Sequence, residues 1–136
     1  MVLAAGLGKR MRPLTASQPK PMVRVAGKPL IDHVLDRLAE AGIAKAVVNV
    51  HYLGDALEAH VTAREMPNVT ISDERERLLE TGGGMVKAAP LLPDPFFEVN
   101  SDNIWLDGPQ NAFHDLSAAW QPDRIGRRRA CSTATA

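Results

Sequence analysis

The stretch that decides the fold runs from residue 3 to residue 15 and reads LAAGLGKRMRPLT. The apolar residues 2–5 predict a short buried strand, which leads directly into the loop Gly6-Leu7-Gly8. Glycines let backbone N–H groups approach phosphate oxygens without interference from a Cβ atom. Lys9 and Arg10 add positive charge, and an arginine can bind two phosphate oxygens at once. The stretch therefore indicates a strand followed by a phosphate-binding loop.

Two glycines separated by one residue are a weak signal when taken alone, because a tight turn from strand to helix needs the same residues. The spacing G-x-x-x-x-G-K-[ST] of a P-loop is absent. The dinucleotide-binding pattern G-x-G-x-x-G is also absent, because Met11 stands at its third glycine. At this level a phosphate-binding loop and a plain turn both remain open.

Length and composition limit the classes of protein that need to be considered. A chain of 136 residues fits one domain with a hydrophobic core. Lys plus Arg and Asp plus Glu number 16 each, and this balance argues against a nucleic-acid or membrane-surface binder. The lone Cys131 excludes an internal disulfide, and no apolar run is long enough to span a membrane. No signal peptide is apparent at the start, so we expect a cytoplasmic protein.

Apolar segments of two different periods alternate along the chain. Strands are predicted over residues 2–5, 46–50, 69–72 and 95–100, and helices over 29–41, 55–65, 84–89 and 110–120. This alternation predicts an α/β domain built from βαβ units around a mostly parallel sheet. Ligands of such sheets bind at the carboxyl ends of the strands. The glycine loop, Asn49 with His51, and Asn100-Ser101-Asp102 all fall at the carboxyl ends of predicted strands, so we expect them to share one rim.

The full N-terminal string, L-A-A-G-x-G-x-R-M-x-P-L-T followed by Pro19-Lys20-Pro21, resembles the signature of the sugar-1-phosphate nucleotidyltransferases. Two more motifs of that family follow in order, L-E-T-G-G-G at 79–84 and V-N-S-D at 99–102. The resemblance implies a three-layer, Rossmann-like fold of the nucleotide-diphospho-sugar transferase type, incomplete at its C-terminus.

The resemblance also implies roles for particular residues. Arg10 and Lys20 would be catalytic, and Asp102 would bind Mg²⁺ as cofactor. Relatives often have glycine where Ser101 stands, so this chain has an extra Cβ beside the expected phosphates. The nucleotide-binding residues implied are Ala4, Ala5, Gly6, Gly8, Lys9, Arg10, Lys20, Glu80, Thr81, Gly82, Gly83 and Asn100, with Glu80 to Gly83 on the side of the base.

Other residues that could carry chemistry have simpler interpretations. His51 is better explained as a packed or surface histidine than as a catalytic one. The remaining histidines lie on predicted helices without metal-binding spacing, and Trp105 and Trp120 are typical packing aromatics. No catalytic triad, acid/base pair of carboxylates or reactive thiol stands out.

The implied partners are a nucleoside triphosphate and a sugar 1-phosphate, and neither nucleic acid nor membrane. Uridylyl transfer from UTP to N-acetylmuramate 1-phosphate is slightly favoured over guanylyl transfer to mannose 1-phosphate, on the L-E-T-G-G-G, N-x-H-Y-L and N-S-D-N-I-W segments. Two alternatives stay open. One is a truncated nucleotide-binding module without turnover, and the other is a marginally folded chain that self-associates through an exposed sheet edge.

The resemblance covers residues 1–120, whereas residues 121–136 form an arginine-rich tail that does not match the family. Family members continue with a second half that supplies most of the sugar pocket and a second metal-binding aspartate in a W-x-D-V-G-T segment, which this chain lacks. One permitted codon choice for residues 126–136, read from its second base, encodes the apolar sequence D-A-V-A-L-V-P-R-Q-R. The hypothesis is a frameshift near residue 125 that replaced a buried strand.

Overall fold

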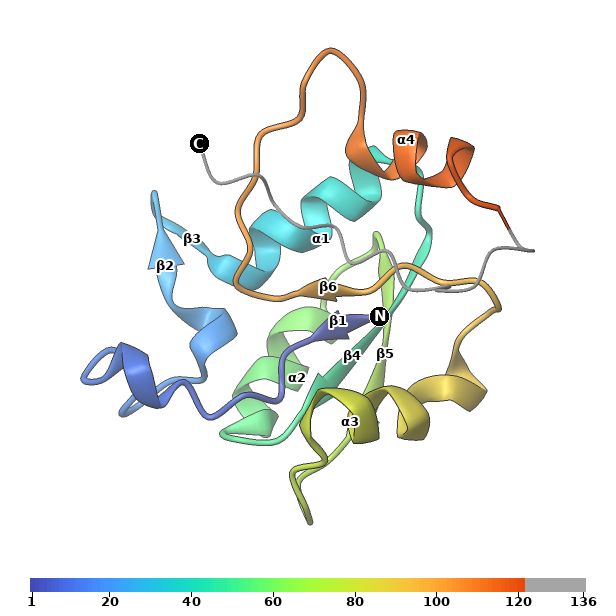
Figure 1. Cartoon of the computed structure of the whole chain (residues 1–136). Coiled ribbons are helices and arrows are strands. Elements are labelled where there is room, and N and C mark those ends of the chain that lie inside the picture. Colours follow the sequence, from blue (N-terminus) through green and yellow to red (C-terminus); the bar gives the residue numbers. More distant parts are fainter. Residues whose placement is uncertain (122–136) are drawn as a thin grey trace.

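A parallel sheet forms the centre of the computed structural model, which describes residues 1–121 (Figure 1). Its four strands lie in the order β5-β4-β1-β6, and all their pairings are parallel. The strands are β1 (Val2–Leu3), β4 (Lys45–Val50), β5 (Asn68–Asp73) and β6 (Val99–Asn100). A separate antiparallel pair, β2 (Arg24–Val25) and β3 (Lys28–Pro29), stands beside the sheet. The predicted α/β, Rossmann-like architecture with a mostly parallel sheet is confirmed.

Helices separate most of the strands. They are α1 (Leu30–Glu40), α2 (Gly54–Thr62), α3 (Glu80–Ala88) and α4 (Ala112–Ala118). Three 3₁₀ turns complete the described elements: η1 (Lys9–Met11), η2 (Lys20–Met22) and η3 (Ala89–Leu91).

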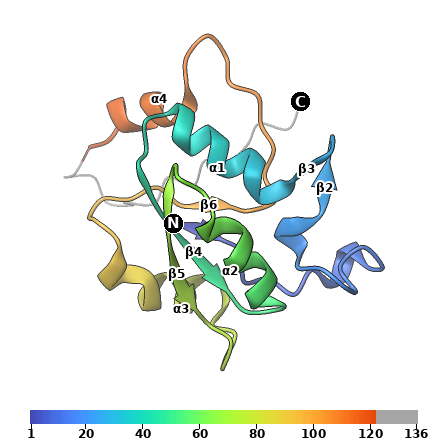
Figure 2. The same cartoon turned by 180° about the vertical axis from the view of Figure 1, so that it is seen from behind.

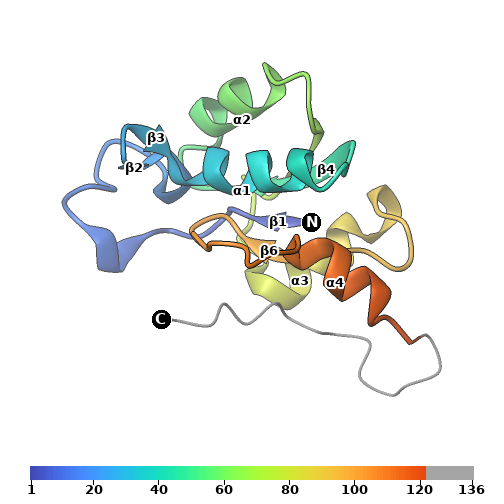
Figure 3. The same cartoon turned by 90° about the horizontal axis from the view of Figure 1, so that it is seen from above.

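The sheet is covered on both faces (Figure 3). One face packs against α1 and α2, and α2 lies across β4 and β5 in the view from behind (Figure 2). The opposite face packs against α3, where Met1, Val47 and Ala88 form a small second cluster. Phe113 of α4 joins the main core and makes edge-to-face contacts with Phe97 and Trp105, at 5.1 Å and 5.8 Å between ring centroids. The packing role predicted for Trp105 is therefore confirmed.

Helix α1 follows its sequence pattern closely. All five apolar residues of the predicted face, Leu30, Ile31, Val34, Leu35 and Leu38, are buried. Gly42 follows the last turn with a φ of 75°, the left-handed conformation that glycine adopts without steric cost.

Strand β6 is shorter than predicted. Residues 95–98 fall outside it, although the apolar run begins at Pro95. Proline has no N–H to donate to a ladder, and the only strand that pairs with β6 among the described residues, β1, is itself two residues long. Hydrogen bonds from the N–H groups of Val99 and Ser101 to the carbonyls of Met1 and Leu3 fix the register.

Helix α3 begins earlier than predicted, at Glu80 rather than at Gly84. Three successive glycines disfavour a helix, but tertiary contacts override this preference. The Leu79 N–H at the start donates to the Glu74 carboxylate, and Met85 and Ala88 are buried. Glu80 has a φ of 57°, a left-handed conformation that costs a residue with a Cβ about 1–3 kcal/mol.

Residues 122–136, with Cys131 and the clustered arginines, lie outside the described part of the chain. The hypothesis of a frameshifted tail therefore falls there and stays a prediction. Within residues 1–121, no helix is both long and apolar enough to cross a membrane.

Candidate nucleotide site

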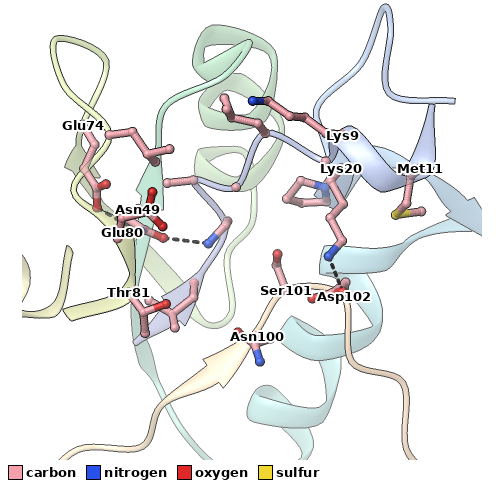
Figure 4. A pocket seen from close by; sticks show the side chains of 18 of the residues that line it. Lys9, Met11, Lys20, Asn49, Glu74, Glu80, Thr81, Asn100, Ser101 and Asp102 are labelled. Carbon is pink, nitrogen blue, oxygen red and sulfur yellow. Dashed lines mark hydrogen bonds and ion pairs between the residues drawn. The ribbon is translucent and has the colours of Figure 1, made fainter. Parts of the chain in front are cut away.

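A pocket of about 680 Å³ opens at the carboxyl ends of β1, β4 and β6 (Figure 4). The rim predicted from the topology is therefore present, except that His51, which was expected beside Asn49, is not among the lining residues. The pocket is lined by Leu3, Ala4, Ala5, Gly6, Leu7, Gly8, Lys9, Arg10, Met11, Lys20, Pro21, Asn49, Glu74, Leu78, Glu80, Thr81, Asn100, Ser101 and Asp102. Three segments far apart in the sequence thus meet around one cavity.

The glycine loop has a fixed conformation at Gly8, which has a φ of 61°. The Gly8 carbonyl accepts hydrogen bonds from the Met11 N–H, at 2.9 Å, and from the Thr15 hydroxyl, at 2.8 Å. A Cβ on Gly8 would lie 2.9 Å from Thr15 Cγ2 and 3.0 Å from Lys20 Cβ. Glycine is therefore required here for its φ and for its lack of a side chain.

Lys9 and Arg10 lie on η1 and are exposed. Within residues 1–121 neither side chain has a hydrogen bond or an ion pair. Both line the pocket, so both cations are available to an anionic ligand.

Lys20 reaches the pocket from η2 and forms an ion pair with Asp102, which follows β6 (Figure 4). The flanking Pro19 and Pro21 are buried, and they restrict the backbone that carries the lysine. The Lys20 and Asp102 side chains are 23% and 34% exposed, so ligands or water can reach both.

Asn100 and Ser101 form the floor of this side of the pocket (Figure 4). Ser101 is buried, and its N–H bonds to the Leu3 carbonyl at 3.0 Å, which holds the strand end against β1. The serine found where relatives often have glycine is therefore accommodated in the β6 ladder.

The opposite wall comes from the start of α3. Glu80 and Thr81 line the pocket, whereas Gly82 and Gly83, which were assigned to the same side, are not among the lining residues. The reason is the early start of α3, which places both glycines in its first turns rather than in a loop.

Two polar pocket residues had no assigned role: Asn49 was expected only at the rim, and Glu74 was not singled out. Asn49 and Glu74 are 3% and 1% exposed, and they hydrogen-bond to each other. The signal for Asn49 was a lone polar residue in the apolar segment 46–50. Glu74 follows β5 in a charged segment, so nothing in its sequence neighbourhood marked it as buried.

The histidines make hydrogen-bond contacts with backbone carbonyls or, at His60, with a carboxylate. His51 Nδ1 lies 2.7 Å from the Glu74 carbonyl, and His60 Nε2 lies 2.9 Å from an Asp32 carboxylate oxygen. In residues 1–121 no group of three or more His, Cys, Asp or Glu side chains is arranged to hold a metal ion. A metal at this pocket would therefore rely on few protein ligands.

Comparison with known proteins gives consistent results. The nucleotidyl transferase family model matches residues 1–122. The chain is 55% identical over 130 residues to N-acetylmuramate alpha-1-phosphate uridylyltransferase of Caulobacter vibrioides, a match that covers 92% of this chain and 54% of the relative. It is 37% identical over 110 residues to the mannose-1-phosphate guanylyltransferase catalytic subunit beta of Danio rerio, with 76% and 30% covered. The chain thus spans about half the length of the first of these curated relatives and about a third of the length of the second.

A solved structure of UDP-glucose pyrophosphorylase complexed with UDP-glucose superposes with a TM-score of 0.74 at 19% identity, covering 87% of this chain and 52% of that one. At this identity the likeness concerns the fold.

Proposed function

The chain belongs to the nucleotidyl transferase family, and we propose that it forms the nucleotide-binding part of an enzyme that transfers a uridylyl group from UTP to N-acetylmuramate 1-phosphate. The observation that carries the proposal is the convergence of the Gly6-Leu7-Gly8 loop, the cations Lys9, Arg10 and Lys20, and the Asp102 carboxylate on one pocket. Guanylyl transfer to mannose 1-phosphate is the alternative. The chain also resembles a mannose-1-phosphate guanylyltransferase, but at 37% identity, so this alternative ranks second.

The reaction forms one bond and breaks one. A phosphate oxygen of the sugar 1-phosphate attacks the α-phosphorus of the nucleoside triphosphate, and the bond to the β-phosphate breaks to release pyrophosphate. A phosphate monoester is already largely dianionic near neutral pH, so no general base is needed. Catalysis then rests on positioning and on neutralising charge.

The lining residues suit that task. The backbone of the Gly6-Leu7-Gly8 loop would approach the phosphates, and Arg10 would bind two phosphate oxygens. Lys20 would stabilise charge at the reacting phosphorus. Glu80 and Thr81 would lie beside the base, Ala4 and Ala5 beneath the nucleotide, and Asn100 beside the sugar phosphate.

Asp102 fits a Mg²⁺ ion. Mg²⁺ favours oxygen ligands, and it is often held by one or two carboxylates together with substrate phosphates. The Asp102 carboxylate lines the pocket, is one-third exposed and already attracts a cation, the Lys20 ammonium. When bound, Mg²⁺ would neutralise charge on the phosphates; Asp102 would hold it, and Lys20 would add its positive charge beside the same phosphates.

Calorimetry and a pyrophosphate assay test the proposal together. We expect UTP with Mg²⁺ to bind more tightly than GTP, and Lys20→Ala or Arg10→Ala to weaken binding about 10- to 150-fold, the range for a charge-assisted hydrogen bond. Lys45→Ala is the matched control, because Lys45 is an exposed cation at the other end of β4. Unchanged UTP affinity in both pocket variants would contradict the assignment.

Turnover separates the enzyme from a nucleotide-binding module. The chain spans 54% of the length of its uridylyltransferase relative. The test therefore asks whether the chain can use the acceptor, the sugar 1-phosphate, as well as bind the nucleotide. Release of pyrophosphate from UTP on addition of N-acetylmuramate 1-phosphate supports the enzyme, and UTP binding without release supports the module.

We also propose that the sheet edge at β6 promotes self-association and that the protein is cytoplasmic. Strand β6 has one neighbour among the described strands, and Ile104 and Leu106, which follow it in the chain, are 45% and 89% exposed. Light scattering across a concentration series tests the first idea, which a constant monomer mass would contradict. Cell fractionation tests the second, and recovery of the chain outside the cytosolic fraction would contradict it.

We retain the division into a nucleotide-binding domain over residues 1–120 and a tail over 121–136, with a frameshift near residue 125 as its origin. Sequencing the source DNA decides the origin. If no reading frame near that point restores an apolar strand and a downstream W-x-D-V-G-T segment, the frameshift is excluded.

A further inference from the structure

Asn49 and Glu74 form a buried polar bridge in the wall of the pocket. Asn49 lies near the carboxyl end of β4, and Glu74 follows the last residue of β5. The Asn49 side-chain amide donates to Glu74 Oε1 at 2.8 Å, and the two side chains are 3% and 1% exposed. The phosphoryl chemistry proposed above uses neither residue.

Each end of the bridge holds one wall of the pocket. The Ala4 N–H, just before the glycine loop, donates to Asn49 Oδ1 at 2.6 Å. The Leu79 N–H, just before α3, donates to Glu74 Oε2 at 3.1 Å. Three consecutive hydrogen bonds therefore connect the wall of the glycine loop to the wall formed by α3.

The third glycine of the 82–84 run packs directly on this bridge. A Cβ on Gly84 would lie 2.6 Å from Glu74 Oε1 and 3.0 Å from Asn49 Nδ2, whereas a Cβ on Gly82 would meet nothing within 4 Å. Gly84 thus lets α3 approach the bridge closely, and the two glycines differ sharply in what surrounds them.

We propose that the Asn49–Glu74 bridge is a positioning device that sets the spacing between the phosphate-binding loop and the base-side wall at Leu79–Thr81. Both Glu74 oxygens and the Asn49 oxygen are occupied by protein donors, so these side chains orient the walls instead of binding the nucleotide. A buried polar network is rigid only when every member has its partner. The loss of one hydrogen bond at Glu74 should therefore loosen the hydrogen bond at the other end of the bridge, between Asn49 and Ala4. The bridge also holds Leu79 beside Glu80, whose left-handed backbone needs support. The relevance to nucleotides rests on the proposed function.

Glu74→Gln tests the coupling in the full chain without ligand. A carboxamide keeps the size of the side chain but replaces one acceptor oxygen with an NH₂ donor. Since Asn49 and Leu79 donate to different oxygens of Glu74, one of these two donors would then face the NH₂ group and lose its acceptor. We expect amide hydrogen exchange, followed by NMR, to speed up about tenfold or more at both Leu79 and Ala4. The response at Ala4 is decisive, because the Ala4 N–H bonds to Asn49 and not to Glu74. Unchanged exchange at Ala4 would overturn the proposal.

Gly84→Ala provides a second variant in case Glu74→Gln does not fold. It adds one methyl group against the bridge, and the same two amides should respond. Gly82→Ala is its matched control and should leave both amides unchanged, since it adds the same methyl to open space on the same helix. Equal exchange in the two glycine variants would contradict the role of the bridge.

Binding distinguishes positioning from simple stabilisation. We expect Glu74→Gln to weaken inorganic tripolyphosphate as well as UTP by about tenfold, although Glu74 lies on the base side. Val61→Ala is the control, because Val61 is a fully buried core residue outside the pocket lining and its loss destabilises the fold without touching the bridge. Unchanged tripolyphosphate affinity in Glu74→Gln would refute a positioning role. If the wild-type chain binds neither ligand, the proposed function fails, and hydrogen exchange still decides whether the bridge couples the walls.

Discussion

Replacing Gly8 with alanine separates two reasons for a glycine in the phosphate-binding loop. The first reason is backbone conformation, because the φ of 61° lies in the left-handed region, which costs an L-residue about 1–2 kcal/mol. The second is space, because the new Cβ would lie 2.9 Å from Thr15 Cγ2 and 3.0 Å from Lys20 Cβ. Thr15 cannot easily move away, since it is buried and its hydroxyl bonds to the Gly8 carbonyl.

Overpacking of this kind typically costs about 1–3 kcal/mol, so Gly8→Ala should destabilise the loop by about 2–5 kcal/mol in total. Gly27→Ala is a control for the conformational part alone. Gly27 has a φ of 79° in the turn between β2 and β3, and a Cβ there would meet nothing within 4 Å. That variant should lose about 1–2 kcal/mol.

Urea unfolding followed by circular dichroism gives the free energy of unfolding for the wild type and both variants. UTP titration reports the case in which the loop opens locally, since strain released by local opening appears as lost affinity. The steric reasoning is refuted if Gly8→Ala loses no more stability than Gly27→Ala and also binds UTP as tightly as the wild type.

Three further predictions concern the metal, the core and acid stability. Asp102→Asn should remove the gain in UTP affinity on adding Mg²⁺, and an unchanged Mg²⁺ titration in calorimetry would contradict Asp102 as a ligand. Ile31→Ala should lower the free energy of unfolding by about 2–5 kcal/mol, because Ile31 is fully buried at the centre of the main core; a loss below 1 kcal/mol in urea would show that the site collapses freely. Burial raises the pKa of Asp36, but hydrogen bonds and charge from Lys28 and Arg64 outweigh it and leave the pKa below its usual 3.8. The stability that the ionised Asp36 contributes is present above pH 3.8 and is lost as pH falls through the lower pKa of the folded state. The free energy of unfolding of Asp36→Asn should therefore fall less steeply with acid than that of the wild type, and it should differ by less than about 1 kcal/mol at pH 7. Parallel acid-unfolding curves for the two proteins would refute this.

Much of the fold could be predicted from local patterns. The apolar face of α1 and the continuous run of β4 carry the periods of a buried helix and a buried strand, so both elements lie within one or two residues of their predicted bounds. The alternation of such elements then limits the sheet to a mostly parallel one. Local patterns failed at β6 and at the start of α3, because each boundary depends on a partner supplied by a distant segment.

The candidate site divides in the same way. Gly8, Lys9, Arg10 and Lys20 were identified from a short ordered string, and the carboxyl-end rule placed Asp102 at the same rim. The ion pair of Lys20 with Asp102 was not anticipated, because it depends on how η2 and the end of β6 pack together.

By itself, the sequence determined the class of fold, the family and the main cations of the pocket, because hydrophobic period, glycine placement and charge are properties of neighbouring residues. Only the tertiary structure decided which polar groups became buried partners. Ala4 and Asn49 are separated by 45 residues and Asn49 and Glu74 by 25, and their hydrogen bonds exist because the parallel sheet brings the ends of β1, β4 and β5 together. The spacing of the pocket walls is therefore a property of the packed sheet, since one wall is held by Asn49 of β4 and the other by Glu74, which directly follows β5.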